Sequence, residues 1–353
     1  MVNRVHNILA QTDMERPLNI LTVICHERYE SGLCQTGHNF YALYQQGLKT
    51  WTTDFAQVPE NYHILRESFS IQDALDSIPD YVNIDLVLSH HRFGSYQLLA
   101  PIAKFLRVPL ISLEHTLPLR TDNGGWHSSR FDQIRSMKGD ENIFISDFSR
   151  MAWMFDPEES HVIEHGIDTE LFAPAKNLTL HDAKDSETGV SALTRKNSCL
   201  SVVNDWINRD VFCGYRMWKS VIDGFPFKVL GTTPGLSSPA NGIQDLADHY
   251  ASHSVFVNTS QISPIPSSLL EAASSGAAIV SASTCMIPEV FTDGVDAFLS
   301  NDVEVLRKRI RQLLNEPEMA REMGKKARQT ILDRFSMERF VNDWNYLFER
   351  HTR

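Results

Sequence analysis

Short apolar runs recur along the chain, and most are followed by a segment with helical periodicity. Runs of this length, bounded by polar or glycine-containing segments, are typical of buried strands. In the first half of the chain they predict strands at residues 18–25, 61–65, 84–89, 109–113, 142–146 and 161–164. In the second half they predict strands at residues 199–203, 227–230, 255–258 and 277–281.

Segments between these strands carry apolar residues at helical spacing. They predict helices at residues 41–48, 70–78, 96–106, 243–250, 269–273, 302–314, 317–334 and 336–349. A further helix is predicted to follow the strand at 142–146 and to run through Trp153. The last helix places Phe340, Trp344, Leu347 and Phe348 on one face. Strands that alternate with helices indicate parallel sheets, and 353 residues suffice for two α/β domains.

Composition narrows the class of protein. The chain is 42% hydrophobic and 22% charged, and its net charge of −11 divides into −8 for residues 1–165 and −3 for residues 166–353. An overall basic face for nucleic acid or anionic lipid is therefore not expected. We find neither an apolar run that could span a bilayer nor the apolar core of a signal peptide, and the five cysteines are scattered. These features favour a protein of the reducing cytoplasm.

Residues 255–300 hold the densest motif. A strand at 255–258 leads through a proline-broken loop to a helix that Ser267 or Ser268 could cap, and Gly276 ends that helix before the next strand. This is half of a nucleotide-binding α/β unit, and the helix N-terminus is the expected place for a diphosphate. Glu271, about one turn inside the helix, could reach ribose hydroxyls.

The same stretch resembles the donor-site signature of retaining GT-B glycosyltransferases of family 4, the glycosyl transferases group 1. The likeness rests on LLEA at residues 269–272, GAAIVSAS at 276–283, PEVF at 288–291 and DG at 293–294. Two positions depart from the family pattern: the first Glu of its pair falls on Ser263, and its Gly-Gly falls on Cys285 and Met286.

The resemblance implies a GT-B fold, in which two Rossmann-like parallel-sheet domains face each other across a cleft. Residues 1–165 would bind the acceptor and residues 166–334 the nucleotide-sugar donor, with the crossing at the HGID motif of 165–168. Residues 335–353 would form a helix that packs back on the first domain. The implied activity is retaining transfer of a sugar from a UDP- or GDP-sugar to a hydroxyl of a saccharide or glycan precursor. Neither a cofactor nor an essential metal is implied.

For the donor side, the resemblance and the strand ends together give a set of candidate residues. Arg209 and Lys219 would hold the diphosphate, because cations suit phosphate oxygens. Glu271 would hold the ribose and counts as catalytic, and the remaining donor candidates are Gly231, Thr232, Ser263, Ser268 and Leu269.

For the acceptor side, polar and aromatic residues follow the predicted strands of the first half, where ten of the fourteen histidines lie. Ligands of parallel sheets bind beyond the carboxyl ends of the strands. The candidates are His26, Arg28, His38, His91, Arg92 and Trp126. In the family, a His at the place of His115 faces the transferred sugar, so His115 is the second catalytic candidate. His90 and His91 do not predict a metal pair, because adjacent residues at a strand end point apart.

Other functions stay open at this level. A hydroxymethylated pyrimidine in phage-type DNA also offers an acceptor hydroxyl, although the charge of −8 in the first half disfavours it. A sugar-nucleotide epimerase would need carboxylates around the donor sugar, where Ser263 offers none. A non-catalytic sensor would bind a nucleotide sugar without releasing nucleotide.

Overall fold

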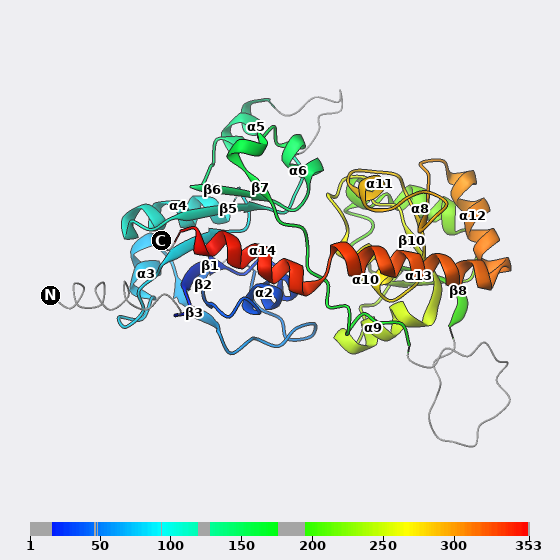
Figure 1. Ribbon diagram of the computed structural model, residues 1–353, viewed down its shortest axis with the longest axis horizontal. Helices are drawn as coiled ribbons and strands as arrows, with labels where there is room; N and C mark the ends of the chain where they lie inside the picture. The colour runs from blue at the N-terminus through cyan, green and yellow to red at the C-terminus, as the bar shows by residue number, and fades with distance from the viewer. Residues whose placement is uncertain are drawn as a thin grey trace, which may run out of the picture.

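The chain folds into two α/β domains that lie side by side (Figure 1). The computed structural model describes residues 16–45, 47, 49–92, 94–118, 128–175 and 195–351. Trp126, an acceptor candidate, lies outside the described residues.

The first domain is built on a seven-stranded sheet of order β3-β2-β1-β4-β5-β6-β7, in which every pairing is parallel. The strands alternate with helices because each crossover must return the chain to the same edge of the sheet. The strands are β1 (Asn19–Val23), β2 (Asn39–Gln45), β3 (Tyr62–Ser68), β4 (Leu86–Ser89), β5 (Leu110–Glu114), β6 (Glu141–Phe144) and β7 (His161–Val162).

The order of these strands reverses beside β1. The chain builds outward through β2 and β3, then returns to the other side of β1, where Ile20 pairs with Leu86. Such a switch point is where open α/β sheets bind ligands. The helices of this domain are α2 (Glu27–Cys34), α3 (Ile71–Asp76), α4 (Ser95–Leu106), α5 (Ser128–Arg135) and α6 (Asp147–Ala152), with a 3-10 turn at Pro157–Glu159.

One prediction for this domain is wrong. The segment after β1 was expected to be a loop followed by a helix at 41–48. It is instead helix α2 followed by strand β2, which pairs with β1 and with β3.

The second domain holds a five-stranded sheet of order β12-β11-β10-β8-β9, also parallel throughout. Its switch point lies between β8 and β10. The strands are β8 (Lys196–Val202), β9 (Phe227–Leu230), β10 (His253–Asn258), β11 (Ala278–Ser281) and β12 (Ala297–Leu299). The helices are α7 (Asp210–Cys213), α8 (Tyr215–Ile222), α9 (Ile243–Ser252), α10 (Ser267–Ser274), α11 (Ile287–Val290), α12 (Val303–Asn315) and α13 (Pro317–Arg334).

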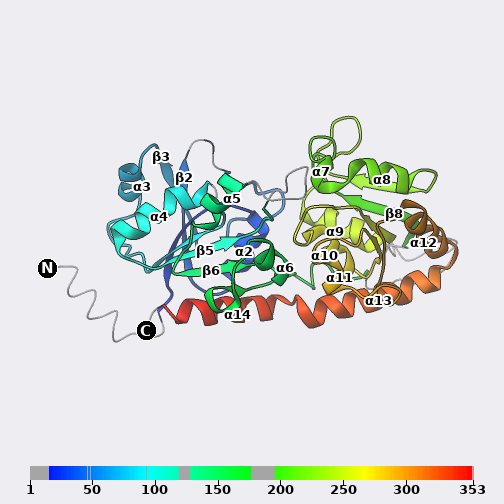
Figure 2. The same cartoon turned by 90° about the horizontal axis from the view of Figure 1, so that it is seen from above.

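The last helix, α14 (Met337–Glu349), returns to the first domain. Figure 2 shows α13 and α14 running in succession along one side of both domains. Phe340, Trp344, Leu347 and Phe348 are buried in the same core as Ile20 and other residues of the first sheet. Where α13 meets α14, the carbonyl of Phe335 accepts a hydrogen bond from Ile167 N at 2.8 Å, so the two inter-domain crossings run side by side.

Candidate active site

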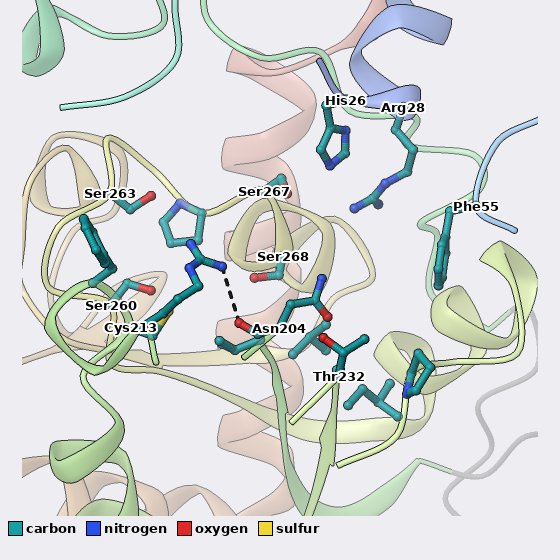
Figure 3. A pocket seen from close by; sticks show the side chains of 18 of the residues that line it. His26, Arg28, Phe55, Asn204, Cys213, Thr232, Ser260, Ser263, Ser267 and Ser268 are labelled. Atoms are coloured by element: carbon teal, nitrogen blue, oxygen red, sulfur yellow. Dashed lines mark hydrogen bonds between the residues drawn. The ribbon is translucent and has the colours of Figure 1, made fainter. Parts of the chain in front are cut away.

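A cavity of about 750 Å³ lies between the two domains. Its walls come from the carboxyl ends of strands in both sheets and from the start of α10. Figure 3 shows His26 and Arg28 approaching from the first domain, opposite Thr232, Ser267 and Ser268 of the second. The residues predicted for the site that line the cavity are His26, Arg28, His115, Arg209, Gly231, Thr232, Ser263 and Ser268.

Helix α10 begins at this cavity. Its N-cap is Pro266, which makes no side-chain cap, so the expectation that Ser267 or Ser268 caps the helix is wrong. These two serines are instead the first helical residues, and both line the cavity. The first N–H groups of a helix have no intrahelical acceptor, so α10 directs free donors and the positive end of its dipole to this wall.

Glu271 lies one turn inside α10 and is buried, with 3% of its surface exposed. Its Oε1 accepts a hydrogen bond from Arg28 Nη1, an ion pair that joins the two domains. Its Oε2 has no hydrogen-bond partner among the described residues. Burial, with the charge of Glu271 beside it, raises the pKa of Tyr250 well above its usual value. Arg28, expected on the acceptor side, is thus engaged with the carboxylate expected to hold the ribose.

Arg209 is the N-cap residue of α7 and lies exposed on the cavity wall after β8. Its guanidinium contacts the carbonyl of Asn204 at 3.4 Å, and no carboxylate pairs with it within the parts of the chain that the structure describes. The charge of Arg209 is therefore available to an anion. Lys219, the second predicted cation, is exposed on α8 over the ring of Tyr215 and does not line the cavity.

Gly231 follows β9 with a φ of +134°. A Cβ at this position would lie 1.9 Å from the carbonyl oxygen of Val203, so no other residue fits without moving the backbone. The close approach joins the ends of β8 and β9 and places Thr232 on the cavity wall.

His115 follows β5 and reaches the cavity from a group of histidines. Its Nε2 lies 3.2 Å from His90 Nδ1, and its ring packs against Tyr29 with centroids 4.6 Å apart. Burial, followed by the neighbouring histidines, lowers the pKa of His115 well below its usual value. A neutral imidazole that donates or accepts a hydrogen bond is therefore the form present near neutral pH.

His91 does not line the cavity, in contrast to its assignment as an acceptor residue. Its Nε2 lies 3.1 Å from Cys25 Sγ and its Nδ1 lies 3.4 Å from Glu114 Oε1. Burial lowers its pKa, but the contacts with Cys25 and Glu114 outweigh burial and raise the pKa of His91 to about 10.

Two further assignments are wrong for reasons of packing. Arg92 is fully buried, with its guanidinium over the rings of Phe144 and Phe155. His38 precedes β2, at the edge of the sheet away from the cavity, where its Nδ1 accepts from Leu18 N at 3.2 Å. Leu269 has a fully buried side chain but lies in the first turn of α10, so its assignment to the donor site through the helix N-terminus stays a prediction.

Several cavity residues were missed by sequence reasoning. Lys49 and Phe55 lie in the segment after β2, and Lys49 Nζ pairs with Glu27 Oε2 at 2.6 Å. Since β2 was mistaken for a helix, the segment after it was not recognised as a strand end. Asn204, beside Arg209, follows a strand that was predicted, and its position alone could have identified it.

Residues 240–330 match the family model described as "Glycosyl transferases group 1". The matched residues lie in the second domain. A comparison with curated protein sequences found no match.

Solved structures confirm the fold. Sucrose-phosphate synthase of Thermosynechococcus elongatus superposes with a TM-score of 0.68 at 12% identity, over 94% of this chain and 98% of the other. A glycosyltransferase of Rickettsia africae superposes with a TM-score of 0.63 at 15% identity, over 95% of this chain and 98% of the other. HepE of Anabaena, solved in complex with UDP-glucose, superposes with a TM-score of 0.63 at 13% identity, over 94% of this chain and 98% of the other.

The resemblance to GT-B glycosyltransferases and the expected two-sheet fold are therefore confirmed. The match of residues 240–330 to the family model also supports the expected enzyme class, a nucleotide-sugar-dependent glycosyltransferase. No helix in the described part of the chain combines the length and apolarity required to cross a membrane.

Proposed function

We propose that this protein is a retaining glycosyltransferase of the family 4 type, which moves a sugar from a UDP-sugar to a hydroxyl of a saccharide or glycan precursor. Residues 1–165 would bind the acceptor and residues 166–334 the donor, with 335–353 packed back on the first domain. The observation that carries the proposal is the cavity, which lies where the switch points of two parallel sheets face each other. A bisubstrate reaction needs such a site, because each domain can hold one substrate.

The second domain offers what a nucleotide diphosphate requires. The diphosphate would lie between the start of α10, at Ser267 and Ser268, and the guanidinium of Arg209. The nucleoside would lie toward Thr232, and the ribose toward Glu271. HepE was solved with UDP-glucose, which supports a UDP-sugar as the donor.

In the reaction, the bond between the anomeric carbon and the diphosphate oxygen breaks, and the diphosphate leaves with the electron pair. The acceptor oxygen forms its bond to the same face of the sugar, and its proton passes to the leaving diphosphate. Arg209 and the α10 N–H groups stabilise the charge on the diphosphate. His115, neutral and opposite the second domain, hydrogen-bonds the transferred sugar. The donor is consumed as a co-substrate, and the proposal includes no cofactor.

A release assay tests this function. The full chain is incubated with UDP-sugars or GDP-sugars and a set of saccharide acceptors, and free nucleotide and glycosylated product are measured. We expect UDP release that depends on the acceptor and a product with the anomeric configuration of the donor. Binding of UDP without any release would overturn catalysis, and an inverted product would overturn retention.

His115→Ala provides the decisive variant. We expect turnover to fall on the order of 10²-fold while UDP affinity stays nearly constant, because the side chain acts mainly in the transition state. His161→Ala, at a half-buried histidine outside the cavity, is the matched control. Normal transfer by a folded His115→Ala variant would show that His115 does not contact the sugar.

The five cysteines all lie in the described part of the chain and form no disulfide bond there, which fits the proposed cytoplasmic location.

A further inference from the structure

Three side chains of metal-ligand type meet at the switch point of the first sheet. Cys25 follows β1, His90 follows β4 and His115 follows β5. The Cys25 Sγ and one ring nitrogen of each histidine all lie within 4.8 Å of one another. The rings of His90 and His91 both lie about equally close to His115, with centroids 5.5 and 5.4 Å away, and His90 belongs to the group of three.

The spacing suits a tetrahedral ion. With Zn–N distances of about 2.0–2.1 Å, two nitrogen ligands of zinc lie about 3.3 Å apart. His90 Nδ1 and His115 Nε2 are 3.2 Å apart, and their rings are stacked with an interplanar angle of 11°. The two nitrogens now share a hydrogen bond, so a small reorientation of the rings and of Cys25 would direct all three ligand atoms at one ion.

A carboxylate lies on the far side of His90. His90 Nε2 is 3.2 Å from Glu30 Oε1 and both side chains are fully buried, although the present geometry is not that of a hydrogen bond. A carboxylate on the second nitrogen of a histidine fixes the tautomer that leaves the first nitrogen free to bind metal. The other oxygen, Glu30 Oε2, is buried without a hydrogen-bond partner among the described residues, so the cluster holds a negative charge that a cation would offset.

We propose that Cys25, His90 and His115 form a three-ligand zinc site, with Glu30 as the residue that positions His90. A thiolate and two imidazoles favour zinc over magnesium or manganese, which prefer oxygen ligands. Cys25 Sγ now lies 3.1 Å from His91 Nε2, and it would exchange this contact for the metal and release its proton. The fourth position faces the cavity, because His115 is one of its lining residues.

Occupancy of this site has a consequence that rests on the proposed function. His115 cannot bind zinc through Nε2 and keep the same orientation toward a transferred sugar. Zinc bound here therefore lowers the rate of sugar transfer, and the site makes the enzyme sensitive to free zinc.

Metal titration tests the site without any sugar. The full chain, treated with a chelator and then dialysed, is titrated with Zn²⁺ by calorimetry and with Co²⁺ by absorption. We expect one ion per chain and a thiolate-to-cobalt charge-transfer band in the near ultraviolet. Cys25→Ser should abolish the band, and Glu30→Gln should weaken binding 10- to 100-fold, as expected for loss of a carboxylate behind a ligand.

Cys285→Ser and His249→Asn are the controls, since both residues are partly accessible and outside the cluster. Circular dichroism checks that each variant folds. Cys25 is only partly buried, so we expect Cys25→Ser to disturb the fold least. Absence of stoichiometric binding, or a band that persists in Cys25→Ser, overturns the site.

The transfer assay then separates the two proposals. We expect Zn²⁺ to inhibit the wild-type protein and to inhibit Cys25→Ser at least tenfold less strongly. Zinc binding together with absent transfer under all conditions would overturn the proposed function and leave the site standing. Equal inhibition of both proteins would show that zinc acts elsewhere.

Discussion

At the scale of single residues, the contact between Arg28 and Glu271 determines how the donor could bind. A buried carboxylate is costly unless it is paired, and here the partner comes from the opposite domain. One oxygen is occupied by Arg28 and the other has no partner in the described chain. A ribose hydroxyl would satisfy the second oxygen, but Glu271 does not line the cavity, so its side chain or its neighbours must move to admit the ribose.

A double-mutant cycle measures this arrangement. We expect Glu271→Ala to weaken UDP binding by about 1.5–3 kcal/mol, since a ribose hydroxyl would lose a charged acceptor. Arg28→Ala should weaken binding less, because the carboxylate remains. Calorimetry on both single variants and on the double variant gives the coupling energy. Unchanged affinity in a folded Glu271→Ala protein would place the ribose elsewhere.

Arg209 and Lys219 form a matched pair of cations, one inside the cavity and one outside. Arg209→Ala should lower the affinity for UDP far more than the affinity for uridine, because only the diphosphate needs a positive charge. Lys219→Ala should leave both affinities within error. Equal losses for UDP and uridine in Arg209→Ala would show that this side chain does not contact phosphate.

Residues at strand ends were predictable where the strand itself was recognised, as for His115, Arg209 and Gly231. Parallel sheets bring the carboxyl ends of their strands to one edge, so position along the chain was enough. Arg92 and His38 were misassigned because the sequence does not give the direction of a side chain. The buried guanidinium of Arg92 lies over the rings of Phe144 and Phe155, which are distant in sequence.

At the scale of elements, the segment 26–48 shows where periodicity fails. Strand β2 reads NFYALYQ, and its central residues are buried on both faces, so it lacks the alternation that identifies a half-exposed strand. Helix α2 contains Gly32, a weak helix former, where a Cβ would lie 3.4 Å from Phe340 of α14. Pairing with β1 stabilises β2, and packing against α14, about 300 residues later in the chain, stabilises α2. Neither contact can be inferred from the sequence of the segment itself.

The corner between α7 and α8 supplies a test of backbone constraint. Gly214 has a φ of +69°, and a Cβ there would lie 2.2 Å from the carbonyl oxygen of Thr259 at the end of β10. Gly224 has a φ of +76° with nothing within 4 Å of a Cβ. Gly224→Ala should cost about 1–2 kcal/mol of unfolding free energy from left-handed strain alone.

Gly214→Ala should cost about 1–3 kcal/mol more, because the added methyl forces the backbone to move. Urea unfolding of the two variants gives the difference. Since Thr259 precedes the loop of Ser260 and Ser263, Gly214→Ala should also weaken UDP binding, whereas Gly224→Ala should not. Equal stabilities for the two variants would contradict the close approach seen at Gly214.

At the scale of the whole molecule, α14 completes a core that begins more than 300 residues earlier. Its amphipathic face was evident from the sequence, because four large apolar residues recur at helical spacing. The surface on which it packs was expected only through the family resemblance. The structure places Phe340 and Trp344 in the core of the first domain, where their exposed fractions are 1% and 0%.

Trp344→Ala should therefore lower the unfolding free energy by about 3–5 kcal/mol, the usual cost of deleting a large buried aromatic side chain. Tyr346→Ala, on the same helix but 69% exposed, is the control and should change stability by less than about 0.5 kcal/mol. Urea unfolding monitored by circular dichroism gives both values. A small loss for Trp344→Ala would mean that α14 is only loosely attached.

The position of α14 also affects the order in which the molecule can fold during synthesis. All strands of the first sheet leave the ribosome before the second domain is made, yet their core stays open until residues 337–349 emerge. Domains otherwise fold in order from the N-terminus. Here part of the core of the first domain, where the ring of Tyr29 packs against Phe340 with centroids 5.3 Å apart, is completed only when the last helix emerges. A nascent chain paused before Met337 should recruit chaperones through this incomplete core, even though its second domain is already complete.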